Sequence, residues 1–305
     1  MTFTTRFAPS PTGHLHIGHA FSAWTAWQAA SEKGGRFILR LEDIDTTRCK
    51  PEFDQVIFDD LIWLGLDWEL PVRRQSEHFD DYARVLERLI EKGVVYRCFK
   101  TRAEILEDIA RAPHGAGEVY RGPAEPMGAD EEAERVAQGE SYAWRLSLDR
   151  CREVLGERFG AMRFLDEIKG EQAADPDPLG DVILARKDVG TSYHIAVVHD
   201  DALQGMTHII RGEDHVTNSA AQIQLFEALG SAAPMMGHVA LLAGADGEGL
   251  SKRLASLSIG ALRQDGIESV AIASLLARIG TADPIVPQRQ LAAIIDNFDL
   301  GKFGR

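Results

Sequence analysis

The sequence predicts an α/β protein with a Rossmann-like parallel sheet, and three stretches near the N-terminus support this fold class. Residues 3–8 are predicted to form a short strand, residues 17–33 a helix, and residues 37–41 an apolar strand. A strand, a helix and a strand within about forty residues are typical of the βαβ unit of a parallel sheet. A turn rich in proline and glycine at 9–13 precedes the helix, and glycines at 34–35 end it.

The later elements are predicted from the spacing of apolar residues, which recur at three and four positions in helices and run continuously in buried strands. The segment 111–138 is dominated by glycine, proline, alanine and glutamate, which indicates a loop-rich insertion. Helices are expected at 51–64, 80–92, 219–229, 267–279 and 288–296, and sheet-like segments at 181–185 and 193–198.

These elements divide the chain into four expected parts. The first half of a catalytic domain is placed at 1–95, an inserted subdomain at 96–180, and the second half of the catalytic domain at 181–245. A glycine-rich loop and a helical C-terminal region occupy 246–305.

Composition restricts the class of protein. The 305 residues include 33 basic and 47 acidic side chains, which gives 33 − 47 = −14 formal charges. This balance excludes a protein that holds nucleic acid by bulk positive charge, so a tRNA or DNA partner would need a local basic face. Arg73, Arg74, Arg84 and Arg88 are candidates for that face, and the alternative is a solvated helix surface.

The setting predicted for the chain is cytoplasmic, without a membrane partner. Its three cysteines, Cys49, Cys98 and Cys151, are far apart and odd in number, which indicates reduced thiols. No apolar run approaches the roughly 18–20 residues of a membrane-spanning helix. A monomer is expected.

The first candidate site is the segment His16-Ile17-Gly18-His19 at the start of the first predicted helix. A helix N-terminus that follows a strand presents free N–H groups and the positive end of the helix dipole, which together bind phosphate. His16 and His19 are three residues apart and lie on nearly the same face, so both can donate to one phosphate. Gly18 leaves room for a flat base or ribose. A histidine-rich cap or a metal-binding pair is the alternative.

The second candidate site is Leu250-Ser251-Lys252-Arg253, which follows a glycine-rich stretch at 244–249. Glycines flanking adjacent cationic side chains suit a loop that closes on a polyanion. Taken alone, the same residues are better explained by a solvated basic turn.

Together the two segments resemble the HIGH and KMSK signatures of class I aminoacyl-tRNA synthetases. The stretches 6–13, 39–45, 65–68 and 210–215 resemble the glutamyl branch of that family, and the resemblance extends from Phe3 to the last residues. It implies an ATP-dependent ligase of protein biosynthesis. Such an enzyme joins glutamate to ATP as glutamyl-adenylate, with Mg²⁺ accompanying ATP, and then transfers the glutamyl group to tRNA.

The resemblance also assigns roles to the residues that match its ATP-site motifs. His16, His19 and Lys252 take the catalytic positions, where they stabilise the charge that develops on phosphate. The family's ATP site additionally includes Gly18, and Ser251 and Arg253 flank the matching lysine. No protein residue is assigned as a metal ligand.

The same match implies the residues of a glutamate pocket. Glu42 matches the acid that binds the ammonium group, and Arg6 and Arg211 match the arginines that recognise carboxylates. Ser10 and Tyr193 match positions that line the pocket. The alternative for Arg6 and Glu42 is a buried ion pair between two strand ends.

Two features depart from longer members of the family. Many relatives bind zinc through a Cys-x-Cys pair and a Tyr-x-x-x-Cys segment in the inserted, acceptor-binding-like subdomain. Here Cys98 is followed by Phe99 and Lys100, and Ala124 stands where the later cysteine would be, so no structural zinc is predicted. The match also leaves no room for an anticodon-binding domain after the helical region.

The acceptor of the glutamyl group is the least determined part of the prediction. Segments 42–45, 75–78 and 193–201 resemble the short paralogue glutamyl-Q tRNA(Asp) synthetase, which attaches glutamate to the queuosine base of tRNA(Asp), and the sequence favours that paralogue. Segments 249–253 and 298–305 resemble instead the catalytic part of a glutamyl-tRNA synthetase, which charges the 3′ end of tRNA(Glu).

Two other classes remain as alternatives. A non-catalytic tRNA-binding paralogue would not need the adenylation residues, all of which are present. A nucleotidylyltransferase of the same fold superfamily would share the His-x-Gly-His segment but would not need Arg6, Glu42 and Arg211 around an amino acid.

Overall fold

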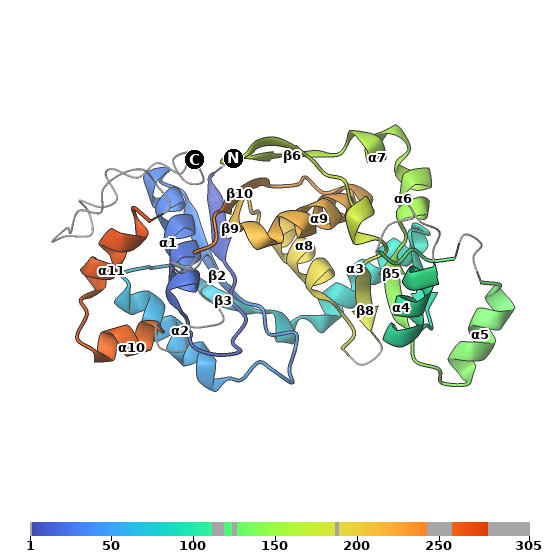
Figure 1. Cartoon of the computed structure of the whole chain (residues 1–305), viewed down its shortest axis with the longest axis horizontal. Helices are drawn as coiled ribbons and strands as arrows, with labels where there is room; N and C mark the ends of the chain where they lie inside the picture. The colour runs from blue at the N-terminus through green and yellow to red at the C-terminus, as the bar shows by residue number, and fades with distance from the viewer. Residues whose placement is uncertain (1, 112–118, 124–126, 187–188, 243–257, 280–305) are drawn as a thin grey trace.

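The computed structural model describes residues 2–111, 119–123, 127–186, 189–242 and 258–279 (Figure 1). The predicted helix at 288–296 and the candidate residues Ser251, Lys252 and Arg253 lie outside these described residues.

Strands and helices alternate along most of the described chain. The strands are β1 (Thr4–Phe7), β2 (Arg36–Leu41), β3 (Glu69–Arg74), β4 (Val95–Cys98), β5 (Ala143–Leu146), β6 (Arg163–Asp166), β7 (Gly170–Ala173), β8 (Ile183–Arg186), β9 (His208–Gly212) and β10 (Met235–Val239). The helices are α1 (Ile17–Glu32), α2 (Glu52–Trp63), α3 (Phe79–Glu91), α4 (Arg102–Arg111), α5 (Ala129–Ala137), α6 (Leu148–Leu155), α7 (Glu157–Ala161), α8 (Tyr193–Leu203), α9 (Val216–Leu229), α10 (Ile259–Gln264) and α11 (Ser269–Leu276).

The centre of the molecule is a Rossmann-like arrangement of parallel strands. β1 pairs with β2 and β2 with β3, while β9 pairs with β10 and β10 with β6, all in parallel. β9 lies beside β1, where the N–H of Thr207 donates to the carbonyl of Thr4 at 3.0 Å. The resulting order is β3-β2-β1-β9-β10. The chain adds strands on one side of β1 first and then on the other side from β9 on, so the strand order reverses between β1 and β9, while the paired strands stay parallel. In such sheets ligands bind at the carboxyl ends of the strands beside this reversal.

The two faces of this layer are covered by different helices. Side chains alternate between faces along a strand, so Phe7 and Leu39 lie on one face while Arg6 and Arg40 lie on the other. Phe7 and Leu39 share a buried cluster with α1, whose Trp24 is fully buried. The arginines point toward α8, which carries their acidic partners. The face of the strand layer that packs against α8 therefore carries charged side chains although it is buried.

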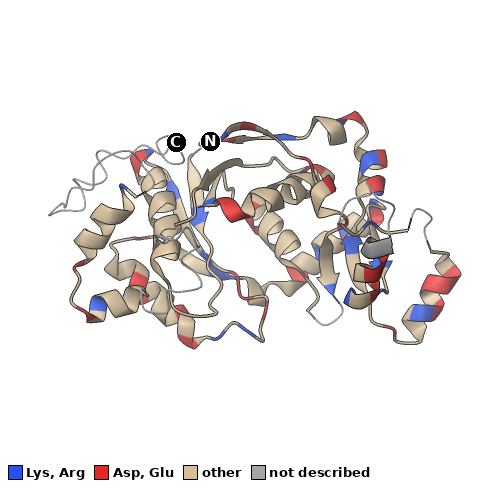
Figure 2. Cartoon of the chain, viewed as in Figure 1, with Lys and Arg blue, Asp and Glu red and all other residues tan. Residues whose placement is uncertain are grey.

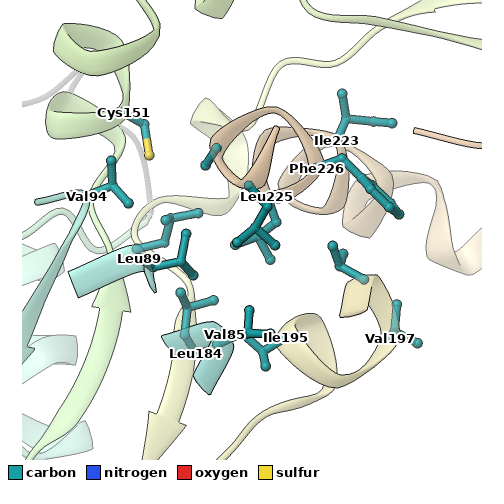
Figure 3. Close-up of a cluster of buried hydrophobic side chains, with 14 of the residues drawn as sticks. Val85, Leu89, Val94, Cys151, Leu184, Ile195, Val197, Ile223, Leu225 and Phe226 are labelled. Carbon is teal, nitrogen blue, oxygen red and sulfur yellow. The ribbon is translucent and has the colours of Figure 1, made fainter. Parts of the chain in front are cut away.

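The sheet-like segment predicted at 193–198 is wrong, because these residues begin helix α8. The run contains Ile195, Val197 and Val198, which favour strands by their branching. In the structure all three are buried, and Figure 3 shows Ile195 and Val197 among the side chains of α9 and other elements. A helix that is buried on most of its surface loses the amphipathic spacing by which helices are recognised in a sequence.

The inserted subdomain is built on a three-stranded antiparallel sheet in the order β4-β5-β8. The strand expected at 181–185 forms as β8 and pairs with β5, whereas the β6–β7 hairpin returns to the central layer through β10. Within the loop-rich stretch at 111–138, the described part includes helix α5.

Hydrogen bonds to one buried carboxylate hold this subdomain together. Asp181 accepts from the hydroxyl of Tyr96 at 2.8 Å and from the N–H of Gly122 at 2.7 Å. Cys98 and Tyr120 are adjacent, with their Sγ and hydroxyl 3.6 Å apart. Among the described residues, no three His, Cys, Asp or Glu side chains are grouped so that they could hold a metal ion. The absence of structural zinc stays a prediction.

The described helices also bear on the membrane question. None of them is both long enough and apolar enough to span a bilayer.

Candidate active site

A pocket of about 630 Å³ opens at the carboxyl ends of β1 and β9, where the strand order reverses. All the predicted site residues that the structure describes line this pocket: Arg6, Ser10, His16, Gly18, His19, Glu42, Tyr193 and Arg211. The described residues that flank the segment 243–257 lie at the same place. Leu242 lines the pocket, and Ser258 forms a β-bridge with His16.

The side chains of His16 and His19 cap the N-terminus of α1. Nδ1 of His16 accepts from the N–H groups of Gly18 and His19, at 3.1 and 3.4 Å, and Nδ1 of His19 accepts from the N–H of His16 at 3.3 Å. Their rings stack with centroids 3.7 Å apart. This is a reciprocal capping box made by imidazoles in place of the usual hydroxyl and carboxylate.

The capping bonds fix the protonation of both rings. Because each Nδ1 accepts a hydrogen bond, a neutral ring carries its proton on Nε2. Burial lowers the pKa of His16, and burial followed by repulsion from His16 lowers the pKa of His19 to about 4. Both side chains are therefore neutral near pH 7, and each offers one Nε2–H donor at the end of a helix.

Gly18 is required by its neighbour as well as by any ligand. A Cβ on Gly18 would lie 3.0 Å from Cε1 and 3.1 Å from Nδ1 of His16. The imidazole that caps the helix thus occupies the space that a side chain would take. From the sequence alone, we predict only that Gly18 leaves room for a base or ribose.

Arg6 and Glu42 both reach the pocket, but they do not pair with each other in the described structure. Nε of Arg6 lies 3.2 Å from Oδ1 of Asp201, and Nη1 of Arg40 lies 2.8 Å from the same oxygen. Nη2 of Arg40 donates to Oε1 of Glu42 at 3.1 Å. Asp201 and Arg40 are buried, so Arg6, Arg40, Asp201 and Glu42 form one cluster of opposite charges, which Arg40 extends to the buried Asp200 at 3.8 Å.

The two acids of this cluster differ in pKa. Burial raises the pKa of Glu42, and the attraction of Arg40 and Arg6 only partly opposes it. The pKa of Asp201 is lowered, because the charges and hydrogen bonds of Arg6 and Arg40 outweigh its burial. The surroundings thus favour the charged form of Asp201 and disfavour that of Glu42, which a cationic group of a ligand would stabilise.

Arg211 is a buried cation without a carboxylate partner in the described part of the chain. Its Nη2 donates to Ser219 Oγ at 2.8 Å, and its Nη1 donates to the hydroxyl of Tyr193 at 3.3 Å. Its Nε donates to Nε2 of His238 at 3.3 Å. Burial lowers the pKa of Arg211. A buried guanidinium surrounded by neutral acceptors retains its charge for an anionic ligand.

The acceptor His238 is itself held by Asp166. Its Nδ1 lies 2.5 Å from Oδ2 of Asp166, and both side chains are buried. Oδ1 of Asp166 also accepts from the N–H groups of Ile168 and Lys169, at 2.9 and 3.0 Å, in the turn between β6 and β7.

Sequence reasoning missed the residues that support the predicted ones. Asp201 lies 195 positions from Arg6, and Asp166 lies 72 positions from His238, so no local pattern connects them. Other residues line the pocket without having been singled out: His14, Asp214, His215 and Asn218. The first three lie in or beside the segments that resemble the family, and only that position in the sequence could have indicated them.

The arginines proposed as a basic patch are mostly neutralised by acids. Arg73 pairs with Asp81 and Asp200, Arg84 pairs with Asp81, and Arg74 pairs with Asp54. Helix α5 in the inserted subdomain is mainly acidic, with Asp130, Glu131, Glu132 and Glu134 against Arg135 (Figure 2). Among the described residues, neither these arginines nor α5 presents a basic face.

The fold and the pocket define a class of protein. A helix N-terminus with neutral imidazole donors, placed beside the reversal of a Rossmann-like layer, is suited to nucleotide phosphates. Arg211, which has no carboxylate partner among the described residues, and Glu42, whose pKa is raised by burial, suit a second ligand that carries both charge signs.

Comparison with known proteins identifies the family. Residues 2–296 match the family described as tRNA synthetases class I (E and Q), catalytic domain. The chain belongs to this family.

Individual relatives agree with this assignment. The chain is 41% identical over 309 residues to glutamate–tRNA ligase 2 of Sphingopyxis alaskensis, and 41% identical over 304 residues to glutamate–tRNA ligase 2 of Dinoroseobacter shibae. These alignments cover 100% and 99% of this chain but 66% of each relative. A glutamate–tRNA ligase from Elizabethkingia meningosepticum, solved in complex with its amino acid, superposes with a TM-score of 0.82 at 27% identity. That match covers 99% of this chain and 66% of the solved one.

Proposed function

We propose that the chain activates glutamate with ATP to form glutamyl-adenylate and transfers the glutamyl group to tRNA. The observation that carries this proposal is the buried guanidinium of Arg211. It lies without a carboxylate partner among the described residues, in the same pocket as the neutral His16 and His19. Family membership and the names of the relatives support the same reaction.

The ATP end of the pocket would be formed by α1. Attack of the substrate α-carboxylate on the α-phosphorus forms the adenylate and releases pyrophosphate, and negative charge shifts onto phosphate oxygens. The Nε2–H groups of His16 and His19 and the N-terminus of α1 would stabilise that charge without adding a proton. By the motif match, Lys252, with Ser251 and Arg253 beside it, would neutralise pyrophosphate. Mg²⁺ would accompany ATP, held mostly by phosphates and water.

The glutamate end would be formed by charges of opposite sign on two sides of the pocket. Glu42, whose pKa is raised by burial, would regain a counter-charge from the substrate ammonium. Arg211 would bind the side-chain carboxylate, and Tyr193 lies against the same guanidinium. Arg6, held by Asp201, and the exposed Ser10 would complete the lining. This arrangement selects a substrate that is both an amino acid and an additional anion.

The acceptor is a finer question, for which two candidates stand. The names of the curated relatives favour the 3′ end of tRNA(Glu). The resemblance of 42–45, 75–78 and 193–201 to the short paralogue favours the queuosine base of tRNA(Asp).

Two measurements test these proposals. We expect ATP–pyrophosphate exchange with glutamate alone among the amino acids, measured with and without tRNA. If none of the amino acids supports exchange, the chain is a non-catalytic binding protein.

We also expect labelled glutamate to be transferred to only one of tRNA(Glu) and queuosine-containing tRNA(Asp) when both are supplied side by side. Ribonuclease digestion of the labelled tRNA would then locate the label, either on the 3′-terminal adenosine or on the anticodon fragment that carries queuosine.

A further inference from the structure

We propose that Asp166 and His238 are positioning residues that orient Arg211 toward the side-chain carboxylate of the bound amino acid. In this arrangement Asp166 fixes the tautomer of His238, and His238 in turn accepts a hydrogen bond from the arginine. The inference rests on the proposed function, because it assigns a task to groups outside the pocket through the one residue that would bind the substrate anion.

The hydrogen bonds determine which nitrogen of His238 carries the proton. The pKa of Asp166 is lowered, because hydrogen bonds from His238, Lys169 and Ile168 outweigh its burial, so Asp166 is ionised near pH 7. Its Oδ2 is therefore the acceptor in the 2.5 Å contact, and Nδ1 of His238 is the donor. Burial lowers the pKa of His238, so the ring is neutral and Nε2 keeps its lone pair.

That lone pair faces Arg211. Nε2 of His238 is 3.3 Å from Nε of Arg211 and 3.1 Å from Oγ of Ser219, which itself accepts from Nη2 of Arg211. The other tautomer would place an N–H of His238 against the N–H of the guanidinium. Asp166 prevents this because its carboxylate accepts a hydrogen bond from Nδ1–H, which keeps the ring proton on that nitrogen.

Neutral acceptors suit this task better than a carboxylate would. A carboxylate beside Arg211 would hold it equally well but would neutralise the charge that the substrate needs. His238, Ser219 and Tyr193 fix the guanidinium plane and leave its charge uncompensated. The negative charge of Asp166 is kept one ring further away.

Asp166 is also fixed from a second direction. Its Oδ1 accepts from two backbone N–H groups of the β6–β7 turn, and its Oδ2 faces the backbone N–H and ring of His238. In an Asp166→Asn variant, the turn would keep the amide oxygen at Oδ1. The amide NH₂ would then face Nδ1 of His238, donate to it, and force the proton onto Nε2.

Three variants test the inference in glutamate-dependent ATP–pyrophosphate exchange with tRNA present. His238→Asn keeps a donor for Asp166 but removes the acceptor for Arg211, while His238→Gln places an amide oxygen near the Nε2 position. We expect His238→Asn and Asp166→Asn to raise the KM for glutamate roughly tenfold, the size expected when a buried charged donor loses its acceptor. The KM for ATP should not change, and His238→Gln should recover most of the loss. The control is Asp149→Asn, at an exposed carboxylate that pairs with Arg152.

The outcomes separate the inference from the proposed function. Equal KM values for glutamate in His238→Asn and His238→Gln would overturn the positioning role, as would a parallel rise of both KM values, which marks general damage. If Asp166→Asn does not fold, the two His238 variants still decide. A wild-type protein that shows no glutamate-dependent exchange would overturn the proposed function, and this inference with it.

Discussion

At the scale of single residues, Gly18 gives the most direct test of the helix cap. A methyl group at this position would lie about 3 Å from the His16 ring, so the ring must shift by a few tenths of an ångström, which weakens its hydrogen bonds with the N–H groups of Gly18 and His19. We expect Gly18→Ala to raise the KM for ATP several-fold and to lower the free energy of unfolding by about 1 kcal/mol, the usual cost of a lost cap. Both quantities are measured by exchange kinetics and urea unfolding.

Gly160→Ala is the matched control for this substitution. Gly160 also lies in a helix, α7, but a Cβ there meets nothing within 4 Å. It should leave the KM for ATP unchanged and should not destabilise the protein. Identical behaviour of the two alanine variants would show that His16 does not depend on the space at Gly18.

The residues that line the pocket could be found from the sequence, but their supports could not. Arg6, Glu42 and Arg211 were singled out because they match short motifs, and the structure places all three in one pocket. Their buried partners Asp201 and His238 stand far away in sequence, in segments that otherwise consist of core residues. Only the packing of α8 and β10 against the strands brings them together, and no local pattern contains that information.

At the scale of elements, α8 shows the same limit and its cause. Its buried apolar run predicted a strand, because a helix with core on several sides has no clean 3.6-residue period. By contrast β1, α1 and β2 were predicted correctly, since turns and glycines mark their ends, whereas β3 was not predicted. The elements with boundary signals were therefore predictable, and the one defined by tertiary burial was not.

The acidic pair on α8 makes this helix the electrostatic support of the sheet. Asp201 holds Arg6 and Arg40, and the adjacent Asp200 accepts from Arg73 at 2.8 Å and from the hydroxyl of Tyr82 at 2.9 Å. We expect Asp201→Asn to lower the free energy of unfolding by about 3 kcal/mol or more, because it leaves two buried arginines with one counter-charge fewer. Urea unfolding at neutral pH measures the loss.

The control for that variant is Asp149→Asn on α6, where the carboxylate is largely exposed and pairs with Arg152. A surface pair of this kind contributes less than about 1 kcal/mol. If Asp201→Asn were no more destabilising than the control, the cluster behind the pocket would be held by packing, and its charges would be incidental to stability.

At the scale of the whole molecule, burial lowers the pKa values of several histidines. The chain has 10 histidines, and among those that the structure describes, burial is the largest cause of a lowered pKa in six. They are His16, His19, His194, His199, His215 and His238. They occur in the central domain on both sides of the pocket wall, so the folded protein keeps a set of imidazoles neutral that the unfolded chain would protonate.

This predicts a fold that loses stability in mild acid. The pKa of His194 is lowered to about 4, from 6.5 in an unfolded chain, so between these values the unfolded state binds more protons and the free energy of unfolding falls as the pH falls. His194 alone should contribute a loss of about 2 kcal/mol between neutral pH and about pH 5. The lowered pKa of Asp201 affects the free energy of unfolding only below about pH 4, and the raised pKa of Glu42 changes it in the opposite direction.

Urea unfolding at both pH values should show the decrease in the free energy of unfolding. This decrease should be smaller in His194→Gln than in the exposed control His14→Gln. A stability that is flat over this range, or equal slopes in the two variants, would mean that His194 is not held neutral by the fold.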